Sequence, residues 1–329
     1  MQNIHFIVGT GRCGTNLLNK MLGYHPQTMA VTETHFISTL ATRFADVELS
    51  PQEFWTVLEE HYTSNGAHRW IDAHLAAGGG ISDKGFFHKQ FIENCHIHTT
   101  HSARVLFFLK MCYEEAAAPN CRFFIDKTPQ YGLDIQAISR LFPSAKFIHL
   151  IRDGRFAATS MVKHEGISRL IKGGHPDTLT NFSYEAQLSH IAPYETAIGE
   201  AILYWEKIVK ATQAQAATLP DSQYLELYYE DLIARPRHTL RQVCDFLELP
   251  FGGRWQWKAA LVPAPQAPTH ELARLTPDEY AILTDLVKNT LEIHNYFTGN
   301  IDEFKNMKTT QNIDNENIRN IFRKILSVK

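Results

Sequence analysis

Short apolar runs rich in β-branched and aromatic residues alternate along the chain with longer stretches of helical periodicity. This alternation predicts an α/β fold, because parallel strands need helical connections that pack on the sheet. Some runs are almost wholly apolar, as is typical of strands buried on both faces. We therefore predict a three-layer α/β/α architecture with a mainly parallel central sheet. The predicted strands are Ile4–Val8, Arg122–Ile125, Lys146–Ile151 and Gln223–Leu227.

The stretch from about residue 36 to residue 120 shows no comparable strand and is predicted to be helical. Its apolar spacing predicts helices over Pro51–Tyr62, Phe86–Ile97 and Ser102–Ala118. We interpret it as a helical insertion within a single domain that covers residues 1–300. Residues 301–329 carry apolar positions at helical spacing and are predicted to form a C-terminal helical tail.

Two further helices follow from local signals in the second half of the chain. The block from Ser183 to Thr218 is predicted to be mostly helical, with Ile198, Ile202, Trp205 and Val209 on one face. The run Thr276-Pro277-Asp278-Glu279 predicts a helix start, with a threonine cap, a proline in the first turn and a glutamate three residues after the cap.

Composition excludes several classes of protein. The 329 residues are 44% hydrophobic and 20% charged, which argues against a disordered or low-complexity chain. The net charge of −3 provides no basic field for nucleic acid. No run approaches the roughly 18 apolar residues of a membrane span, and the amino terminus lacks the pattern of a secretory signal. The five cysteines show no disulfide spacing, so we expect a soluble, reduced, cytoplasmic protein without nucleic-acid or membrane partners.

The most informative segment runs from Val8 to Leu17, where an apolar strand enters a glycine-rich turn and a helix is predicted from Thr15 to Tyr24. Such a P-loop-like strand–loop–helix directs backbone N–H groups at one centre, at the positive end of a helix dipole. Glycine permits the tight curvature and lets an anion approach closely. The predicted phosphate-binding residues are Gly11, Arg12, Cys13, Gly14, Thr15 and Asn16.

Two common nucleotide-binding loops compete for this segment. Gly9 and Gly14 have the spacing of the P-loop of nucleotide kinases, but Thr15 stands where that loop has its phosphate-binding lysine. This difference disfavours an ordinary ATPase or kinase. The glycines also match the dinucleotide fingerprint G-x-G-x-x-G, with Glu33 close to the expected ribose-binding acid, so a Rossmann enzyme stays open at this point.

A second candidate anion site lies much later in the chain. The apolar run Phe147–Ile151 ends in Arg152, a glycine turn follows, and Ser160 comes about two helical turns later. An arginine at a strand end and a serine on the next helix can hold a phosphate from two sides. A Rossmann enzyme does not need this second site, whereas a donor that carries a second, remote phosphate does.

With both elements in place, the chain resembles the sulfotransferases that use 3′-phosphoadenosine 5′-phosphosulfate (PAPS). In that family a strand–loop–helix holds the 5′-phosphosulfate, which the loop described above would do here. An arginine and a serine spaced like Arg152 and Ser160 bind the 3′-phosphate. The resemblance covers most of residues 4–250 and implies transfer of a sulfuryl group, with adenosine 3′,5′-bisphosphate (PAP) as product and no metal. It also implies that Tyr229 lies beside the adenine, with core packing as the alternative.

The resemblance also implies catalytic residues. The run from His25 to Thr34 is similar to the segment of tyrosylprotein sulfotransferases whose glutamate is the base, which implies Glu33. His35 is the second candidate, because histidine titrates near neutral pH. Lys127 lies in a segment similar to one by which tyrosylprotein and polysaccharide sulfotransferases contact the transferring group. Lys127, Arg12 and the loop amides are expected to stabilise the charge that develops on the bridging oxygen.

Three further residues have weaker support. Arg254 and Lys258 fall where members of this family close a loop over the cofactor, and we predict that they contact the 3′-phosphate. Cys13 precedes a helix, a position that can activate a thiol, but the family places small residues there and we expect packing.

The acceptor is the least determined part of the prediction. The chain lacks the membrane anchor of the tyrosylprotein enzymes, and its residue 36–120 insertion has no counterpart in them that we identify. We therefore expect a hydroxyl or amino group of a small-molecule or saccharide acceptor. The alternatives are a protein-tyrosine sulfotransferase, a P-loop nucleotide kinase and a non-catalytic nucleotide-binding protein. The sequence leaves the oligomeric state open, a homo-oligomer included.

Overall fold

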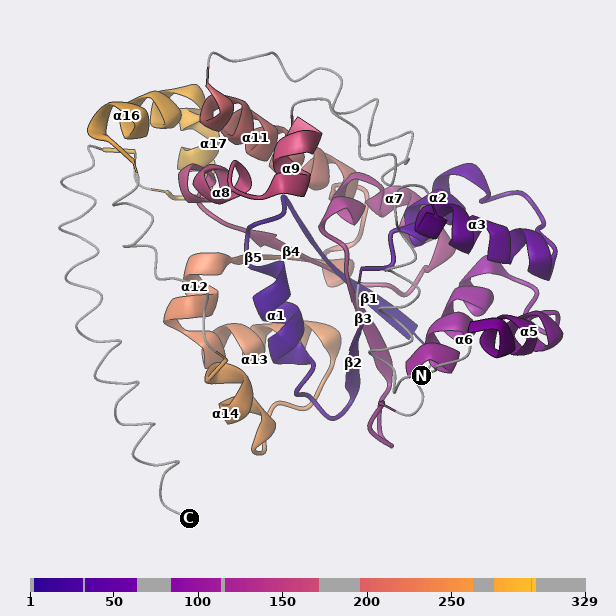
Figure 1. The fold of residues 1–329 in the computed structure, drawn as a ribbon. Helices are drawn as coiled ribbons and strands as arrows, with labels where there is room; N and C mark the ends of the chain where they lie inside the picture. The colour runs from indigo at the N-terminus through magenta and orange to yellow at the C-terminus, as the bar shows by residue number, and fades with distance from the viewer. Residues whose placement is uncertain are drawn as a thin grey trace.

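The computed structural model describes residues 3–31, 33–63, 84–113, 116–171, 196–262, 275–296 and 298–299. At its centre is a five-stranded sheet with the order β2-β3-β1-β4-β5 (Figure 1). Every neighbouring pair of strands is parallel. The strands are β1 (Asn3–Gly9), β2 (Thr28–Val31), β3 (Phe123–Lys127), β4 (Phe147–Ile151) and β5 (Tyr224–Tyr228).

The sequence predicts four of these strands to within two residues at either end, and the parallel sheet is confirmed. Strand β2 was missed. It has only four residues, lies at an edge and pairs with β3 alone. Two of its side chains are only half-buried, so it lacks the continuous apolar run that identifies the inner strands.

Helices cover both faces of the sheet, which confirms the three-layer α/β/α prediction (Figure 1). Alternate side chains of β1 enter different cores: Phe6 and Val8 face one core, and Ile7 the other. The helices packed with Ile7 are α1 (Thr15–Leu22), α13 (Pro236–Leu247) and α14 (Trp255–Ala260). The opposite face carries α7 (Ile135–Leu141), α8 (Gly154–Met161) and α11 (Ala197–Ala216).

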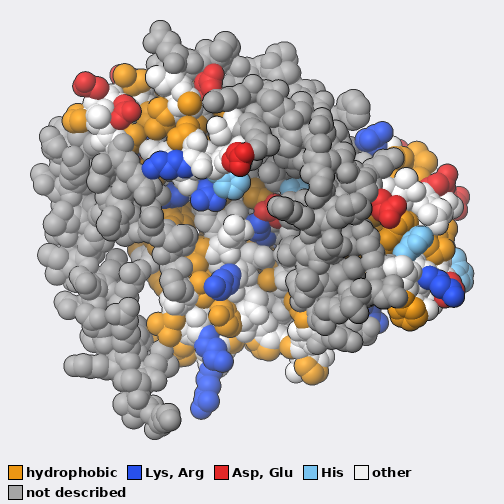
Figure 2. Space-filling view, in the orientation of Figure 1, with side chains coloured by type: hydrophobic (Ala, Val, Ile, Leu, Met, Phe, Trp, Pro, Cys, Tyr) orange, Lys and Arg blue, Asp and Glu red, His pale blue; other side chains and the backbone are white. Residues whose placement is uncertain are grey.

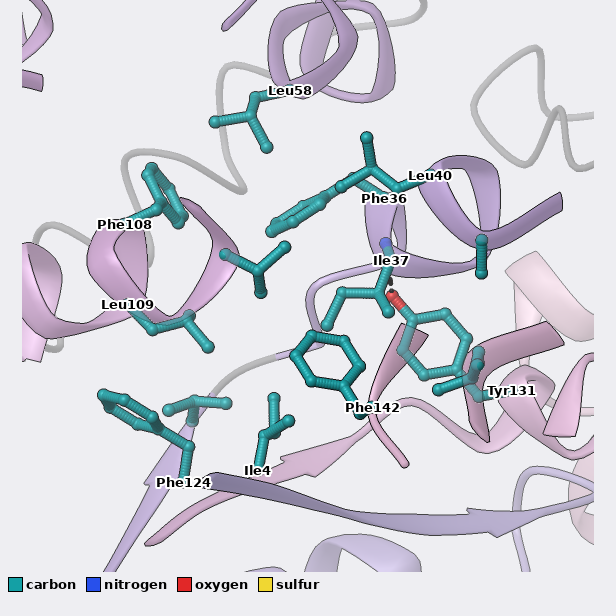
Figure 3. Close-up of a cluster of buried hydrophobic side chains, with 14 of the residues drawn as sticks. Ile4, Phe36, Ile37, Leu40, Leu58, Phe108, Leu109, Phe124, Tyr131 and Phe142 are labelled. Atoms are coloured by element: carbon teal, nitrogen blue, oxygen red, sulfur yellow. Dashed lines mark hydrogen bonds between the residues drawn. The ribbon is translucent and has the colours of Figure 1, made fainter. Parts of the chain in front are cut away.

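Four helices lie between β2 and β3 among the described residues, as the helical insertion predicts. They are α2 (Phe36–Arg43), α3 (Pro51–Thr63), α5 (Lys84–Cys95) and α6 (His101–Tyr113). Helix α2 was not predicted, and α6 ends before the predicted Ala118. Phe36 and Phe108 from these helices share one apolar core with Ile4 and Phe124 of the sheet (Figure 3).

The second half of the chain agrees with its local signals where it is described. Helix α11 starts at Ala197 because the Thr196 side chain accepts a hydrogen bond from the Gly199 N–H. Thr276 forms the predicted capping box with Glu279 at the start of α16 (Pro277–Leu286), which α17 (Lys288–Ile293) follows. Predictions for residues 183–195 and for the tail 301–329 lie outside the described residues.

The remaining elements connect these layers. Helix α9 (Glu165–Ile171) follows α8, and α12 (Tyr229–Ala234) follows β5 directly. Two 3₁₀ helices, η1 (Pro129–Leu133) and η2 (Asp221–Gln223), lie after β3 and before β5. In the part of the chain that the structure describes, no helix is long and apolar enough to cross a membrane.

Because all five strands are parallel, their carboxyl ends meet at one edge of the sheet, where α/β proteins bind ligands. Most residues that the sequence predicts for the site follow these ends. They are the loop 10–14 after β1, Glu33 after β2, Lys127 at the end of β3, Arg152 after β4 and Tyr229 after β5.

Removing an aromatic ring from the core shared by the insertion and the sheet tests this architecture. Phe108 is fully buried, so Phe108→Ala should lower the free energy of unfolding by about 3–5 kcal/mol in a denaturant titration. Phe86→Ala is the matched control, because that ring is 62% exposed on α5 and its loss should cost under about 0.5 kcal/mol. Equal losses for the two variants would contradict the packing described here.

Candidate functional site

The loop between β1 and α1 has the backbone shape of an anion cradle. Gly11 and Gly14 have φ angles of 75° and 95°, and Arg12 between them has 55°. These left-handed values favour glycine, and a non-glycine residue there is strained. A Cβ on Gly9 would lie 2.7 Å from the Cys13 Sγ and 2.8 Å from the Leu150 carbonyl oxygen, so the loop also needs glycine for space.

The amino end of α1 suits an anion as well. Gly14, the residue that precedes α1, has no side chain with which to cap this end of the helix. The first-turn N–H groups of a helix have no partner within the helix, so an anion is a natural partner for them. The Cys13 side chain is fully buried, and burial raises the pKa of its thiol. Packing is therefore the structural role of Cys13, as expected from the sequence.

The two predicted anion-binding elements adjoin, although 140 residues separate Arg12 from Arg152. The Nη1 of Arg152 donates to the carbonyl oxygen of Arg12 at 3.0 Å. The Nε of Arg12 donates in turn to the Oγ of Ser160 at 3.0 Å. Lys and Arg side chains gather on this face of the molecule, where α8 lies beside the amino end of α1 (Figure 2).

Tyr229 fills the space between the loop and Arg152. The Arg152 guanidinium carbon lies 4.5 Å from the centre of the Tyr229 ring, a cation–π distance. A Cβ on Gly14 would come within 2.3 Å of the same ring. With 1% of its surface exposed, Tyr229 packs in the core, which is the alternative that the sequence left open. Contact with an adenine stays a prediction.

The backbone around Arg152 is fixed by residues that the sequence did not identify. Trp205 Nε1 donates to the Arg152 carbonyl oxygen at 3.0 Å, and the Asp153 N–H donates to a Glu230 carboxylate oxygen at 3.1 Å. The buried Arg155 forms an ion pair with Asp153 at 2.6 Å. The periodicity marked Trp205 only as a core residue, and no local pattern links Glu230 to a strand so far away in sequence.

A second group of predicted residues surrounds Glu33. One carboxylate oxygen accepts a short hydrogen bond from the Lys127 Nζ, and the other lies 3.0 Å from the His35 Nε2. Burial by itself would raise the pKa of Glu33, but the hydrogen bonds and charges of His35 and Lys127 outweigh it and lower the pKa to about 2. Glu33 is therefore a carboxylate at neutral pH.

The four predicted catalytic residues thus fall into two groups at one sheet edge. Glu33, His35 and Lys127 form one group. The Arg12 guanidinium lies on Ser160, and the predicted contact of Arg12 with the transferring group stays a prediction. The arrangement offers cationic contacts for an anion with two charged ends, next to a carboxylate that can accept a proton.

The sequence profile of the sulfotransferase family matches residues 5–253, a range that contains both groups. The chain belongs to the sulfotransferase family. It is 23% identical over 242 residues to protein-tyrosine sulfotransferase 2 of Gallus gallus, which covers 74% of this chain and 50% of that protein. Protein-tyrosine sulfotransferase A of Caenorhabditis elegans is 23% identical over 246 residues, covering 75% of this chain and 50% of that protein. The chain spans about half the length of these curated relatives.

Solved sulfotransferase structures share the fold. A sulfotransferase domain from the curacin biosynthetic pathway has a TM-score of 0.52 and 20% identity, over 84% of this chain and 83% of that one. A sulfotransferase domain from the Synechococcus PCC 7002 olefin synthase has a TM-score of 0.50 and 22% identity, over 80% of this chain and 78% of that one.

In this member of the sulfotransferase family, Arg254 and Lys258 lie away from the second anion site. Both side chains are exposed, and Trp255 between them packs with its ring centre 4.6 Å from that of His25, beyond the carboxyl end of α1. The phosphate loop precedes the other end of this helix, about 12 Å away. The structure therefore does not bring Arg254 and Lys258 to Ser160, and their contact with a 3′-phosphate stays a prediction.

The lowered pKa of Glu33 predicts a pH-dependent contribution to stability. Since the folded value of about 2 is below the ordinary 4.5, the contribution is complete above about pH 4.5 and is lost as the pH falls towards 2. We expect urea unfolding to show wild type more stable than Glu33→Gln at about pH 6, with a smaller difference at about pH 3. A difference that does not change with pH would contradict the ion pair.

Proposed function

We propose that this chain transfers a sulfuryl group from PAPS to a hydroxyl or amino group of a small-molecule or saccharide acceptor. One observation carries the proposal: the loop after β1 and the Arg152–Ser160 element, far apart in sequence, adjoin through Arg12. A donor with a phosphosulfate at one end and a phosphate at the other needs two such elements. Membership of the sulfotransferase family supports the same conclusion.

The residues at this edge of the sheet suit PAPS. In the proposal, the loop from Gly11 to Asn16 and the amino end of α1 hold the 5′ end, and Arg152 with Ser160 holds the 3′-phosphate. Arg12 serves both elements, because its backbone belongs to the loop and its guanidinium lies on Ser160. When bound, PAPS supplies the sulfuryl group and is left as PAP.

Glu33 is the proposed base. Lys127 and His35 keep its carboxylate ionised, so one oxygen can accept the proton of the acceptor. A carboxylate with such a low pKa accepts this proton late, when bond formation has made the acceptor group strongly acidic. Lys127 shares its ammonium protons between Glu33 and the negative charge that grows on the donor side.

Protein tyrosine is the alternative acceptor, and the names of the curated relatives favour it. The helices between β2 and β3 are the part of the chain in which an acceptor pocket of its own could be built. An ordinary nucleotide kinase is less well supported, because Thr15 stands in place of the P-loop lysine. A non-catalytic binding protein would have no need of the Glu33–Lys127 pair.

We also propose that the protein works in the cytoplasm. The support is its cysteine chemistry: all five thiols are free, and four of them are buried. Reduced cysteines without disulfide partners are typical of a reducing compartment.

Thermal-shift titration tests the proposed donor. PAP without metal should raise the melting temperature of the wild type, and Mg-ATP and Mg-GTP should do so far less. Arg152→Ala should largely remove the PAP effect, because a charge-assisted contact is lost. Arg140→Ala is the matched control, since this exposed arginine lies in the last turn of α7, near the opposite edge of the sheet. Stabilisation by Mg-ATP alone would overturn the proposal in favour of a kinase.

Glu33→Gln tests the proposed base. With labelled PAPS and a metabolite extract, we expect the turnover of the variant to fall by about 10²–10⁴-fold. Its PAP-induced thermal shift should stay close to that of the wild type, because the anion-binding elements are intact. Full activity would transfer the role to His35 or another group.

The wild-type arm of this assay also identifies the acceptor. Mass measurement of the labelled product separates a sulfated metabolite or sugar from a sulfated protein. Label found only on tyrosine peptides added to the extract would replace the small-molecule acceptor with the alternative.

A further inference from the structure

A buried hydrogen-bond cluster joins the two segments that carry Glu33 and Lys127. Thr34 directly follows Glu33, and Asp126 and Thr128 stand on either side of Lys127. The Thr34 hydroxyl donates to one Asp126 carboxylate oxygen at 2.5 Å, and the Thr128 hydroxyl donates to the other at 2.6 Å. The Thr34 N–H also donates to the Thr128 Oγ1 at 3.2 Å. One carboxylate therefore ties the end of β3 to the segment after β2.

Tyr131 extends this cluster to the start of α2. Its hydroxyl oxygen accepts from the Ile37 N–H at 3.0 Å (Figure 3). The same oxygen lies 2.7 Å from the Thr34 Oγ1. The single hydroxyl proton of Thr34 goes to Asp126, so Tyr131 is the donor to Thr34. The hydrogen bonds thus run in one direction, from Ile37 through Tyr131 and Thr34 to the Asp126 carboxylate.

The cluster is shielded from water. Thr34, Asp126 and Thr128 are fully buried, and 1% of Tyr131 is exposed. A hydrogen bond lost at such a depth is not replaced by one to solvent, so the cluster resists rearrangement. Asp126 also accepts at both oxygens from neighbouring hydroxyls, so its carboxylate has partners without reaching the surface.

The backbone between the two anchored points is strained. His35 has a φ angle of 51°, a left-handed value that a non-glycine residue adopts only when its surroundings impose it. Thr34 on one side and Ile37 on the other are both held by the cluster. These anchors fix the conformation in which the His35 ring and Lys127 reach the two oxygens of Glu33.

We propose that Asp126 is a positioning residue for transfer. Its carboxylate, through Thr34 and Thr128, holds Glu33 and Lys127 in fixed positions relative to each other. This inference rests on the proposed function, which makes those two residues catalytic. Asp126 itself does not touch a substrate, because it is fully buried. Its contribution is to keep the carboxylate and the ammonium group at the geometry that transfer requires.

Asparagine cannot replace this carboxylate. Its amide offers one oxygen acceptor, whereas both threonine hydroxyls donate to Asp126. The amide NH₂ would face one of these hydroxyls, which would then have to accept at this position instead of donating. Asp126→Asn therefore preserves volume while breaking the direction of the hydrogen bonds.

The chain contains a matched control. Asp134, at the start of α7, accepts a hydrogen bond from the hydroxyl of Ser38 in α2. Both residues are buried, and neither adjoins Glu33 or Lys127 in sequence. Asp134→Asn thus removes the charge of a comparable buried carboxylate that accepts from a hydroxyl of the same region, and it leaves the contacts of Glu33 and Lys127 in place.

The test measures kcat, the KM for PAPS and the melting temperature with labelled PAPS and the acceptor found as described above. Asp126→Asn should lower kcat by about 10–100-fold and change the KM for PAPS by less than about 2-fold. Asp134→Asn should lower the melting temperature and leave kcat unchanged. If both variants lose kcat in proportion to their loss of stability, Asp126 is only structural and the proposal is wrong.

Two threonine variants keep the test valid if Asp126→Asn does not fold. Thr34→Val removes the hydroxyl at nearly constant volume and should lower kcat as Asp126→Asn does. Thr34→Ser keeps the hydroxyl and should restore most of the rate. In a Glu33→Gln background, Asp126→Asn should lower kcat by a much smaller factor than in the wild type, because Asp126 acts through Glu33. Full activity of Thr34→Val, or additive losses in the double variant, would overturn the proposal.

Hydrogen exchange separates this inference from the proposed function. In Asp126→Asn, peptides covering residues 33–37 should exchange faster than in the wild type, whereas Asp134→Asn should leave them unchanged. This readout needs no turnover. If the wild type transfers no sulfuryl group but these peptides lose protection, the proposed function fails while the anchoring by Asp126 stands; unchanged exchange overturns the anchoring itself.

Discussion

The guanidinium group of Arg152 donates to the backbone of the glycine-rich loop at Arg12, and this contact joins the two candidate anion-binding elements. It can form only because β1 and β4 are neighbours in a parallel sheet, which places the residues after both strands at one edge. Tyr229 packs between Arg152 and Gly14 and so supports this contact. Trp205 of α11 donates a hydrogen bond to the Arg152 carbonyl oxygen. The candidate anion-binding site is thus assembled from residues on or next to β1, β4, β5 and α11.

The other half of the site comes from β2 and β3. There the Glu33–Lys127 pair places opposite charges together, with His35 on the second oxygen. In the proposed function the two halves have different tasks: Arg12, Arg152 and Ser160 hold the donor, and Glu33 and Lys127 act at the reacting group. Adjacent strands β3 and β1 bring the halves together at the sheet edge.

Buried polar residues hold the backbone on which the site residues stand. Around Arg152, the Asp153–Arg155 ion pair and Glu230 bind the backbone on the carboxyl side of the strand. Around Glu33, Asp126 does the same through two threonines. Both clusters are buried, and hydrogen bonds at buried positions are costly to break.

The sequence by itself determined the strands with continuous apolar runs and the glycine-rich loop after β1, and it singled out Arg152 and Ser160 as a second candidate anion-binding element. These features are local, because a strand end, a tight turn or a helix start is determined by residues that are neighbours in sequence. Glu33 and Lys127 could be predicted as candidates in the same way, because each lies in a short segment similar to one in known sulfotransferases, and the structure places the two side chains in contact.

The tertiary structure decided which of these residues meet. Strand β2 lacks an apolar run and acquires its place by pairing with β3. The side chain of Arg12 lies on Ser160 rather than beside Lys127, and Arg254 lies towards the far end of α1. Trp205, Glu230 and Asp126 gained their positions through contacts across many residues of sequence. Such contacts depend on the order of the strands and on how helices pack between them, and no local pattern of residues encodes either.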